Sequence, residues 1–597
     1  MILANHGATR AHIIIADDAS AATWHTAEVL SSYLYEMTGA NLTIHPASRG
    51  TIGNQDAAEI CVGQTGRAGA PELTGLKNDG YILKTVGNRL FILGENDRAV
   101  LHAVYAFLED VLGCRFFTDT VEHVPQRAYL AIGEVDKKVV SPFEYREVFG
   151  NVCYDDDEFA SKRGLNGLNG MGLTQDAEHG GSIRYWGFGH TFNMLVPVEE
   201  FFDEHPEYFS MIDGKRVSGR EGNNKYLTLD LVGTQLCLTN PDVIRIVTER
   251  IRKSIQEHPE CRIFSISQND CGNYCTCPEC ARVDAEEGAH SGSLLRLVNA
   301  VANDIAQDYP DVIIDTFAYQ YTRKPPKLTR PAPNVCVRIC SIECCFTHPL
   351  AECHRAMFPF VFATTPGVTF QQDLADWSRI ASHLVVWDYT TNFRFYLAPM
   401  VNLHVLQDNI RFFRDNNVTG LFEQGNGQSV SGEFGELRGY LISKLMWEPD
   451  GDVEKWTREF LTGYYGAAAG PIHAYIKLLA GHVTRYDLHA GIYESPKAFL
   501  HNALIPKMDA LWDEAEALAD NEEILERVQR SRLQVRFIKF HRKGPGDDDY
   551  DAVCEQLIAD IRRHGITYIQ EGKDIEKSFD EMRHGTLPGT SRSDYRW

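Results

Sequence analysis

Polar and acidic side chains follow directly after an apolar run at residues 261–267. The run alternates apolar with small side chains, a pattern typical of a strand that is buried on both faces. Gln268, Asn269 and Asp270 come immediately after it. Two carboxamides and a carboxylate at the end of a core strand are the arrangement by which an α/β barrel presents catalytic groups. The alternative interpretation is a polar turn that caps the next helix.

Similar strand ends recur further along the chain. Glu343, Asp388 and Glu423 each follow a short apolar run. Aromatic, amide and imidazole side chains stand at further predicted strand ends: Trp186, His190, Asn193, Tyr319, Gln320, Trp387 and Tyr389. One such carboxylate is usually an ion-pair partner or a helix cap, but four at equivalent ends predict one shared site.

Carboxylates beside aromatic and amide groups match the needs of a sugar hydrolase. One carboxyl must stay protonated to donate to the leaving oxygen, and a second group must stabilise an oxocarbenium-like transition state. Crowding of carboxylates raises the pKa of at least one of them. Aromatic faces stack on sugar rings, while amides and carboxylates bind hydroxyls. A metal hydrolase also uses acidic residues, but the sequence has no HExxH motif, and His190 is either structural or a substrate contact.

Four cysteines crowd the segment that begins after Asp270: Cys271, Cys275, Cys277 and Cys280. Their spacing is compatible with a zinc ion whose fourth ligand is Cys271, His290 or a carboxylate. The alternative is a tight loop of reduced thiols. We expect no cofactor for the reaction, and at most a structural zinc ion, because these cysteines lie beyond the strand end.

Charge and composition limit the class of partner. The net charge of −24 argues against a nucleic-acid partner. No apolar run reaches the roughly 20 residues of a membrane span, so we expect no membrane partner. The 15 cysteines are scattered and odd in number, which favours a reducing compartment. Because no signal-peptide pattern is visible, we expect a cytoplasmic protein; loss of a leader by trimming would instead leave a secreted or periplasmic one.

Three segments with different patterns of predicted secondary structure would position these residues. Residues 1–137 mix short strands with two amphipathic helices and predict a small α+β domain. Residues 138–450 repeat strand, loop and helix, with candidate strands at 143–149, 187–195, 234–239, 261–267, 312–319, 334–342, 383–388 and 419–423. This alternation predicts an α/β fold of the (β/α)₈ TIM-like barrel type. An open doubly wound sheet ranks lower, since no Gly-rich nucleotide fingerprint follows a strand. Residues 451–597 predict an α-helical C-terminal domain.

Several segments also resemble known families. The stretch GENDRAVLHAVYAFLEDVLGCRFFTDTVEHVP at 94–125 resembles the N-terminal domain that precedes the barrel in α-glucuronidases and β-hexosaminidases. The segment SISQNDCGNYCTCPEC at 265–280 resembles the domain of unknown function 4838, which includes glycoside hydrolase family 163. Further segments share this resemblance, at 187–197, 205–216, 235–243, 281–306 and 437–450.

The resemblance implies a (β/α)₈ glycosidase, in the characterised cases an endo-β-N-acetylglucosaminidase that acts on N-glycan cores with retention. We therefore predict a retaining β-N-acetylglucosaminidase-type enzyme with a glycan or oligosaccharide substrate. Asp270 would be the acid/base, and Asn269 would orient the substrate. Glu343 or Asp388 would be the nucleophile, unless the substrate's own acetamido group attacks and Glu343 or Asn269 positions it.

Two alternatives stay open. An exo-acting α-glucuronidase-like enzyme would bind a uronic acid through arginines near strand ends: Arg184, Arg323, Arg338 and Arg394. The second alternative is a non-catalytic carbohydrate-binding protein on a degenerate barrel. The strand-end carboxylates argue against it, because binding alone needs no protonated acid. The predicted substrate-binding set is Trp186, His190, Asn193, Gln268, Tyr319, Gln320, Trp387, Asp388, Tyr389 and Glu423.

Overall fold

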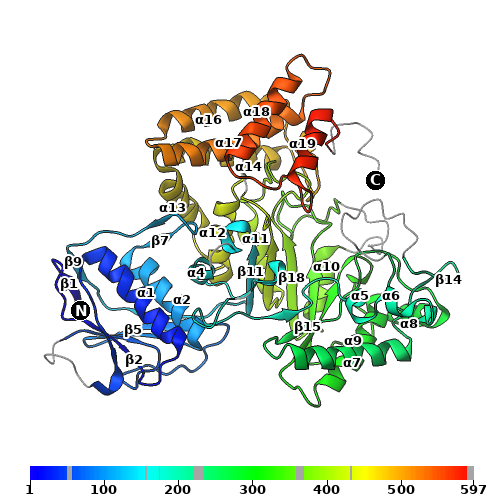
Figure 1. The fold of residues 1–597 in the computed structure, drawn as a ribbon, viewed down its shortest axis with the longest axis horizontal. Coiled ribbons are helices and arrows are strands. Elements are labelled where there is room, and N and C mark those ends of the chain that lie inside the picture. The colour runs from blue at the N-terminus through cyan, green and yellow to red at the C-terminus, as the bar shows by residue number, and fades with distance from the viewer. Residues whose placement is uncertain are drawn as a thin grey trace. The chain divides into compact units, whose positions relative to one another are not determined.

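The computed structural model describes residues 1–49, 57–154, 157–173, 175–219, 233–357, 369–430 and 433–587. The chain divides into two compact units (Figure 1). The first unit comprises Met1–Ser182 and Glu436–Ala469, and the second comprises Ile183–Gly435 and Gly470–Trp597.

The first unit is built around a mixed six-stranded sheet with two helices. The strand order is β10 (Asp136–Val139), β5 (Tyr81–Val86), β6 (Arg89–Gly94), β4 (Glu59–Val62), β2 (His12–Ile15) and β3 (Ile44–Pro46). Helices α1 (Ala21–Thr38) and α2 (Asp97–Phe107) pack on this sheet. Ser20 begins α1 by accepting a hydrogen bond from the Thr23 N–H, and Gly39, at a φ of 69°, ends it. The predicted small α+β domain at the N-terminus is confirmed.

The second unit contains a curled parallel sheet. Its strands run in the order β19 (Gly420–Gln424), β18 (His383–Tyr389), β17 (Val335–Cys340), β16 (Ile313–Ala318), β15 (Ile263–Ser265) and β12 (Tyr185–Trp186). Helices alternate with these strands along the chain: α7 (Pro241–Glu257), α9 (Ser291–Ile305), α10 (Phe370–Ser378) and α11 (Leu406–Asp415). This alternation is the pattern of a TIM-like barrel, so the predicted α/β fold class is confirmed.

Two of the predicted strands do not form as expected. Beyond Trp186 the chain turns at Gly187, whose φ is 67°, and residues 192–195 form the short helix α5 (Phe192–Leu195). A glycine in this left-handed conformation interrupts a strand because the extended backbone cannot continue through it. In the predicted strand 234–239, Leu236 makes only an isolated bridge with Phe209.

The two faces of the parallel sheet differ in chemistry. Arg338 on β17 is fully buried, and its guanidinium lies 5.1 Å from the ring centroid of Tyr185. Since the strand of Tyr185 lies three positions away in the sheet, this contact places Arg338 on the concave, inner face. Side chains alternate along a strand, and Trp387 is in register with Cys340, so Trp387 and Tyr389 share the inner face with Arg338. Asp388 therefore points to the outer face.

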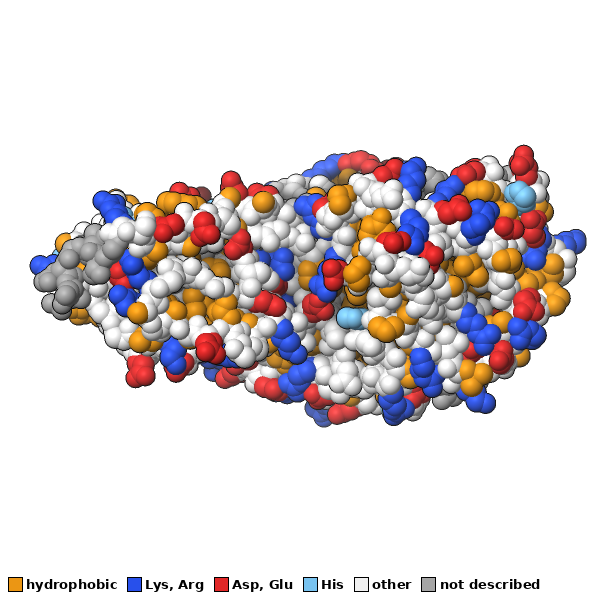
Figure 2. Space-filling view, turned by 90° about the horizontal axis from the view of Figure 1, so that it is seen from below, with side chains coloured by type: hydrophobic (Ala, Val, Ile, Leu, Met, Phe, Trp, Pro, Cys, Tyr) orange, Lys and Arg blue, Asp and Glu red, His pale blue; other side chains and the backbone are white. Residues whose placement is uncertain are grey.

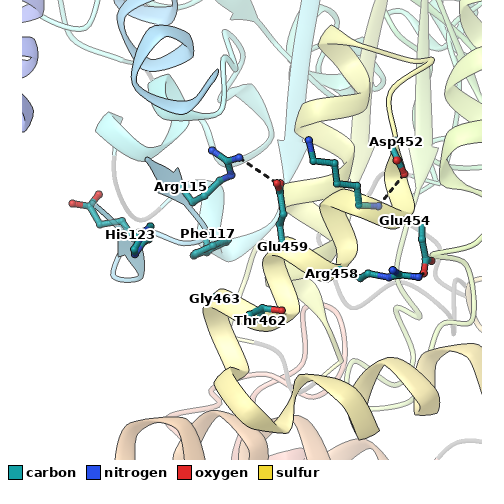
Figure 3. A pocket seen from close by; sticks show the side chains of 11 residues that line it. Arg115, Phe117, His123, Asp452, Glu454, Arg458, Glu459, Thr462 and Gly463 are labelled. Carbon is teal, nitrogen blue, oxygen red and sulfur yellow. Dashed lines mark hydrogen bonds and ion pairs between the residues drawn. The ribbon is translucent and has the colours of Figure 1, made fainter. Parts of the chain in front are cut away.

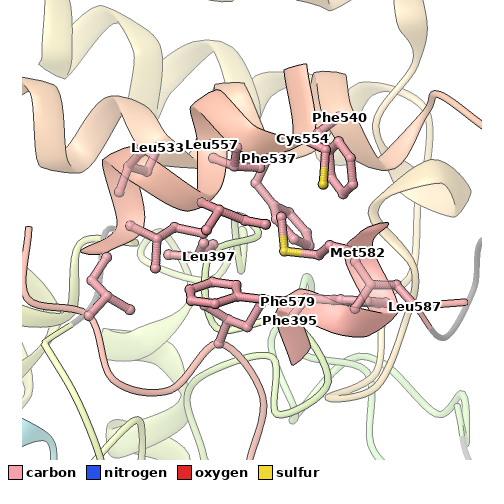
Figure 4. Packing of buried hydrophobic residues seen from close by; sticks show 14 of the residues in the cluster. Phe395, Leu397, Leu533, Phe537, Phe540, Cys554, Leu557, Phe579, Met582 and Leu587 are labelled. Atoms are coloured by element: carbon pink, nitrogen blue, oxygen red, sulfur yellow. The ribbon is translucent and has the colours of Figure 1, made fainter. Parts of the chain in front are cut away.

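The C-terminal helices of the second unit share a core with a loop of the barrel (Figure 4). Helices α17 (Glu522–His541), α18 (Tyr550–Arg563) and α19 (Ile575–His584) contribute Phe537, Leu557 and Phe579, among other apolar side chains. These pack against Phe395 and Leu397 from the loop that follows β18. Burial of these large apolar groups holds the segment between α18 and α19 against the barrel.

The surface carries both signs of charge. Figure 2 shows acidic and basic side chains interspersed over the face in view. Among the residues that the structure describes, the helices are all too short or too polar to cross a bilayer.

Candidate active site

Asp270 lies in the turn after β15 and is half buried. Its Oδ1 accepts a hydrogen bond from the Tyr319 hydroxyl at 3.0 Å and one from Gln320 Nε2 at 3.3 Å. These two donors fix the position of the Asp270 carboxyl group. Gln320 has a φ of 51°, a left-handed conformation that is costly for a residue with a side chain and that clusters at functional sites.

A second carboxyl group, Glu571, reaches the same region from the segment between α18 and α19. Its backbone N–H donates to the Phe393 carbonyl at 2.9 Å, which fixes this segment to the loop after β18. Glu571 is exposed at the surface, but the surrounding protein removes part of its hydration, and this desolvation raises the pKa of Glu571 to about 7; the negative charge of Asp270 adds to that rise. The two carboxyl groups therefore lie close enough to interact electrostatically.

Aromatic side chains surround the two carboxyl groups. Trp387, half buried on the inner face, donates from its indole N–H to Gln424 Oε1 at 2.7 Å. Gln424 Nε2 in turn donates to Glu571 Oε1 at 3.3 Å. Burial raises the pKa of the Tyr493 hydroxyl, and the charges of Glu571 and Asp270 raise it further. Tyr493 therefore lies near both carboxyl groups. This arrangement joins two carboxyl groups to aromatic rings, the combination that sugar-binding sites use.

The predicted substrate contacts just before Asp270 are instead occupied by protein groups. The Gln268 side chain is fully buried; it donates to the Tyr319 carbonyl and accepts from the Thr322 hydroxyl. Asn269 donates from Nδ2 to the Thr234 carbonyl at 2.8 Å and accepts from the backbone N–H of Asn193 at 3.3 Å. These bonds fix the shape of the turn that presents Asp270.

His190, Asn193 and Trp186 also have partners within the protein. His190 Nδ1 is hydrogen-bonded to the Gln268 carbonyl, and its ring lies 6.0 Å from that of Tyr319. Asn193 Oδ1 accepts from the Val198 N–H at 3.0 Å. The Trp186 side chain points away from that of its neighbour Tyr185, to the outer side of the sheet. There its ring stacks on that of Phe264, its register partner in β15. Of these three, His190 lies beside the Tyr319 ring that contacts Asp270.

Glu343 lies in a buried ion pair. It is 2% exposed and contacts the guanidinium of Arg323, which also bonds to Asp373 Oδ2 at 2.7 Å. Burial raises the pKa of Glu343, and the charge of Arg323 opposes that rise. The structure thus places Glu343 in a closed network between β17 and α10.

Asp388 and Glu423 form a separate buried pair on the outer face of the sheet. They are register partners in neighbouring strands, and they are 3% and 1% exposed. Burial raises the pKa of Asp388 to about 6 while a hydrogen bond from the Ser341 hydroxyl opposes the rise. Burial and the charge of Asp388 raise the pKa of Glu423 well above its usual range. The structure does not bring them together with Asp270.

The arginines expected to bind a uronic acid are mostly engaged. Arg338 pairs with Asp315 Oδ2 at 2.5 Å inside the sheet, and Arg323 holds Glu343 and Asp373. Arg394 lies over the ring of Tyr493, with 5.9 Å between its guanidinium carbon and the ring centroid. Arg338 also lies over a ring of the site, 5.4 Å from the ring centroid of Trp387.

Glu571 and Tyr493 were not predicted from the sequence. Both lie in segments between helices, where no strand end marks a functional residue. Isolated acidic residues in such segments are common on protein surfaces, so the sequence carries no signal for Glu571.

A pocket of about 760 Å³ lies in the first unit (Figure 3). Its charged side chains pair with one another: Arg115 with Glu459 at 3.2 Å, and Arg458 with Glu454 at 2.7 Å. These ion pairs hold the charged side chains of the pocket to one another.

Two groups of side chains in the described part of the chain have the chemistry of metal ligands. The first is Cys237, Cys275, Cys277 and Cys280, and the second is Cys345, His348, Cys353 and His489. Cys271 lies outside the first group, and its sulfur accepts from Gln235 Nε2 at 3.3 Å. His290 is paired with Asp284 instead.

Comparison with solved structures shows the fold. A family GH115 4-O-methyl-α-glucuronidase with specificity for decorated arabinogalactans has a TM-score of 0.56 at 10% identity, covering 99% of this chain and 80% of its own. A GH138 enzyme that targets pectin rhamnogalacturonan II has a TM-score of 0.42 at 9% identity, over 98% and 99% of the two chains. A mutant Streptomyces plicatus β-hexosaminidase in complex with GlcNAc has a TM-score of 0.43 at 13% identity, over 78% and 92%.

No curated protein matches the chain. The family described as "Domain of unknown function (DUF4838)" matches residues 116–477, which is more than half of the sequence. The chain therefore belongs to this family of domains of unknown function, DUF4838.

Proposed function

We propose that the protein is a glycoside hydrolase with its active site at Asp270 and Glu571. The observation that carries this proposal is the pairing of Asp270, whose carboxyl group accepts two hydrogen bonds, with a carboxyl group whose pKa is raised to about 7, beside the Trp387 indole. Glycoside hydrolysis needs that pair of carboxyl groups and that kind of aromatic surface. The TIM-like barrel fold, which the GH115 enzyme shares, is compatible with this chemistry.

Each carboxyl group has a role that follows from its surroundings. Protonated Glu571 donates its proton to the oxygen of the leaving group as the glycosidic bond breaks. Asp270, held by Tyr319 and Gln320, faces the developing positive charge as a carboxylate. Glu571 then takes a proton from the water that completes the hydrolysis. The acid role predicted for Asp270 from the sequence passes to Glu571 in this proposal.

We propose a retaining enzyme of the β-N-acetylglucosaminidase type that acts within glycans. Asp270 either attacks the anomeric carbon or orients the acetamido group of the substrate, which then attacks. Both routes retain the anomeric configuration. The buried positions of Glu343, Asp388 and Asn269 favour supporting roles for these three residues.

A second candidate function is that of an α-glucuronidase, because Arg394 lies over the ring of Tyr493 in the proposed site. A guanidinium there could pair with the carboxylate of a uronic acid. Arg394→Met would then abolish binding of a uronide but leave cleavage of neutral sugars unchanged.

A digestion panel tests the proposal. We would incubate the full chain with aryl N-acetyl-β-glucosaminides, aryl glucuronides and an N-glycan mixture, and measure products by mass spectrometry. We expect cleavage by the wild type, at least about 100-fold slower cleavage by Asp270→Asn, and unchanged cleavage by Asp376→Asn, which removes a partly exposed carboxylate on α10. Binding without cleavage over the whole panel would contradict the proposal and support a carbohydrate-binding role.

A further inference from the structure

Four cysteine sulfurs in the second unit converge from two segments of the chain. Cys237 comes from the loop before α7, while Cys275, Cys277 and Cys280 come from the loop before α8 (Pro278–Glu287) and from its first turn. All four side chains are buried free thiols. The Cys237 sulfur lies 3.7 Å from that of Cys277 and 3.8 Å from that of Cys280. A disulfide would need about 2.05 Å, so these contacts are not incipient disulfides.

These separations match the edges of a zinc tetrahedron. Four sulfurs at about 2.3 Å from one zinc ion lie about 3.8 Å from one another. Polar hydrogens also point at the sulfurs: the Met211 N–H lies 3.4 Å from the Cys275 sulfur, and Arg216 Nη1 lies 3.6 Å from it. Such donors stabilise metal-bound thiolates, and a cluster of four buried neutral thiols would have no need of them.

A second group mixes two sulfurs with two imidazoles. The Cys345 sulfur lies 3.5 Å from His348 Nδ1 and 3.3 Å from His489 Nδ1. The Cys353 sulfur lies 3.5 Å from His489 Nδ1. In a tetrahedral zinc site with Zn–S of about 2.3 Å and Zn–N of about 2.0 Å, a sulfur and a nitrogen lie about 3.5 Å apart.

The far sides of the two imidazoles support the same interpretation. Nε2 of His348 lies 3.5 Å from Asp487 Oδ1, and Nε2 of His489 lies 3.3 Å from that oxygen. Both rings thus turn Nδ1 to the sulfurs and Nε2 to a carboxylate. A carboxylate behind the histidine is the usual outer partner of a zinc-bound imidazole, because it fixes the tautomer and raises the basicity of the ligand.

We propose that the chain holds two structural zinc ions, one bound by Cys237, Cys275, Cys277 and Cys280 and one bound by Cys345, His348, Cys353 and His489. Each set fills all four positions of a tetrahedron with protein atoms, which is the mark of a structural site. Soft thiolate and imidazole ligands select zinc over magnesium or calcium.

The second site joins distant parts of the second unit. Cys345, His348 and Cys353 lie in the loop after β17, whereas His489 lies beyond α14 (Ala469–Arg485). A backbone hydrogen bond lies beside this site, from the Phe346 N–H to the Ala490 carbonyl at 2.9 Å. Zinc at this point would fasten the segment that leads to Tyr493 at the candidate active site.

Metal content and zinc X-ray absorption of the full chain test both sites. For protein purified without chelators, we expect two zinc ions per chain, with an average shell of three sulfurs at about 2.3 Å and one nitrogen at about 2.0 Å. Because this measurement uses the wild-type protein, it does not depend on whether a variant folds. A protein without zinc, or a shell of nitrogen and oxygen alone, would overturn both sites.

Variants separate the two sites. We expect one zinc ion per chain in Cys277→Ser and one in His489→Ala, and none in the double variant. Cys61→Ala, which removes a buried cysteine of the first unit, should keep two. A wild-type protein with a single zinc ion and a pure sulfur shell would overturn the site of His489 and uphold that of Cys277.

Discussion

Replacement of Glu571 by glutamine tests the proposed acid most sharply. Glutamine keeps the size of the side chain and an oxygen that can accept from Gln424, which lies 3.3 Å away. It removes the proton that the leaving group needs. We expect kcat/KM to fall by about 10²- to 10⁴-fold, the usual contribution of general acid catalysis.

The pH dependence of kcat/KM is a second test of Glu571 as the acid. With a pKa of about 7, Glu571 is about 90% protonated at pH 6, whereas with its ordinary pKa of 4.5 it would be about 3% protonated. In the wild type, kcat/KM should therefore fall about tenfold per pH unit above about pH 7. In Glu571→Gln this alkaline limb should disappear, and aryl substrates with an acidic leaving group should lose the least activity.

A matched variant and a clear opposite outcome complete the test. Glu576→Gln removes an exposed carboxyl group nearby on α19, where it pairs with Arg562 at 2.7 Å, and should leave the whole profile unchanged. If Glu571→Gln keeps the alkaline limb and a rate within about twofold of the wild type, Glu571 is not the acid and the pKa argument is wrong.

Three further predictions concern stability. Arg323→Met should lower the free energy of unfolding by about 3–5 kcal/mol in urea titrations, since it leaves Glu343 buried without its cation. Asp388→Asn should stabilise the protein at about pH 7 but not at about pH 3.5. With its raised pKa, Asp388 keeps its proton in the folded wild type at pH values where the unfolded chain has released it. The free energy of unfolding of the wild type therefore falls as the pH rises from 3.8 to about 6. Phe537→Ala should cost about 3–5 kcal/mol, seen as a lower unfolding midpoint, and should also lower kcat/KM because it loosens the segment that carries Glu571.

The alternation of strands and helices was readable from the sequence, because apolar runs followed by amphipathic stretches leave few other folds. The direction of each side chain at a strand end was not. Both faces of these strands are buried, so the apolar pattern does not show which residue faces inward. Trp387 and Asp388 are neighbours in the sequence, yet only Trp387 is on the inner face. The register decides this, and register is a property of the assembled sheet.

The sequence also does not show which residues distant along the chain come together in the fold. Phe537 and Phe395 pack the C-terminal helices against the loop after β18, and this packing brings Glu571 near Asp270. Likewise, the local cysteine spacing indicated three of the four sulfurs, but the fourth comes from Cys237 and not from the adjacent Cys271. In both cases tertiary packing selects the partner, and no local pattern records that choice.

The central claim is that Asp270 and Glu571 act together to break a glycosidic bond. The most direct measurement is product release from an N-glycan and aryl-glycoside panel by the wild type, Asp270→Asn and Glu571→Gln, each shown by circular dichroism to be folded. The account predicts cleavage by the wild type and losses of about 100-fold or more in both variants. Equal cleavage by all three proteins would contradict it.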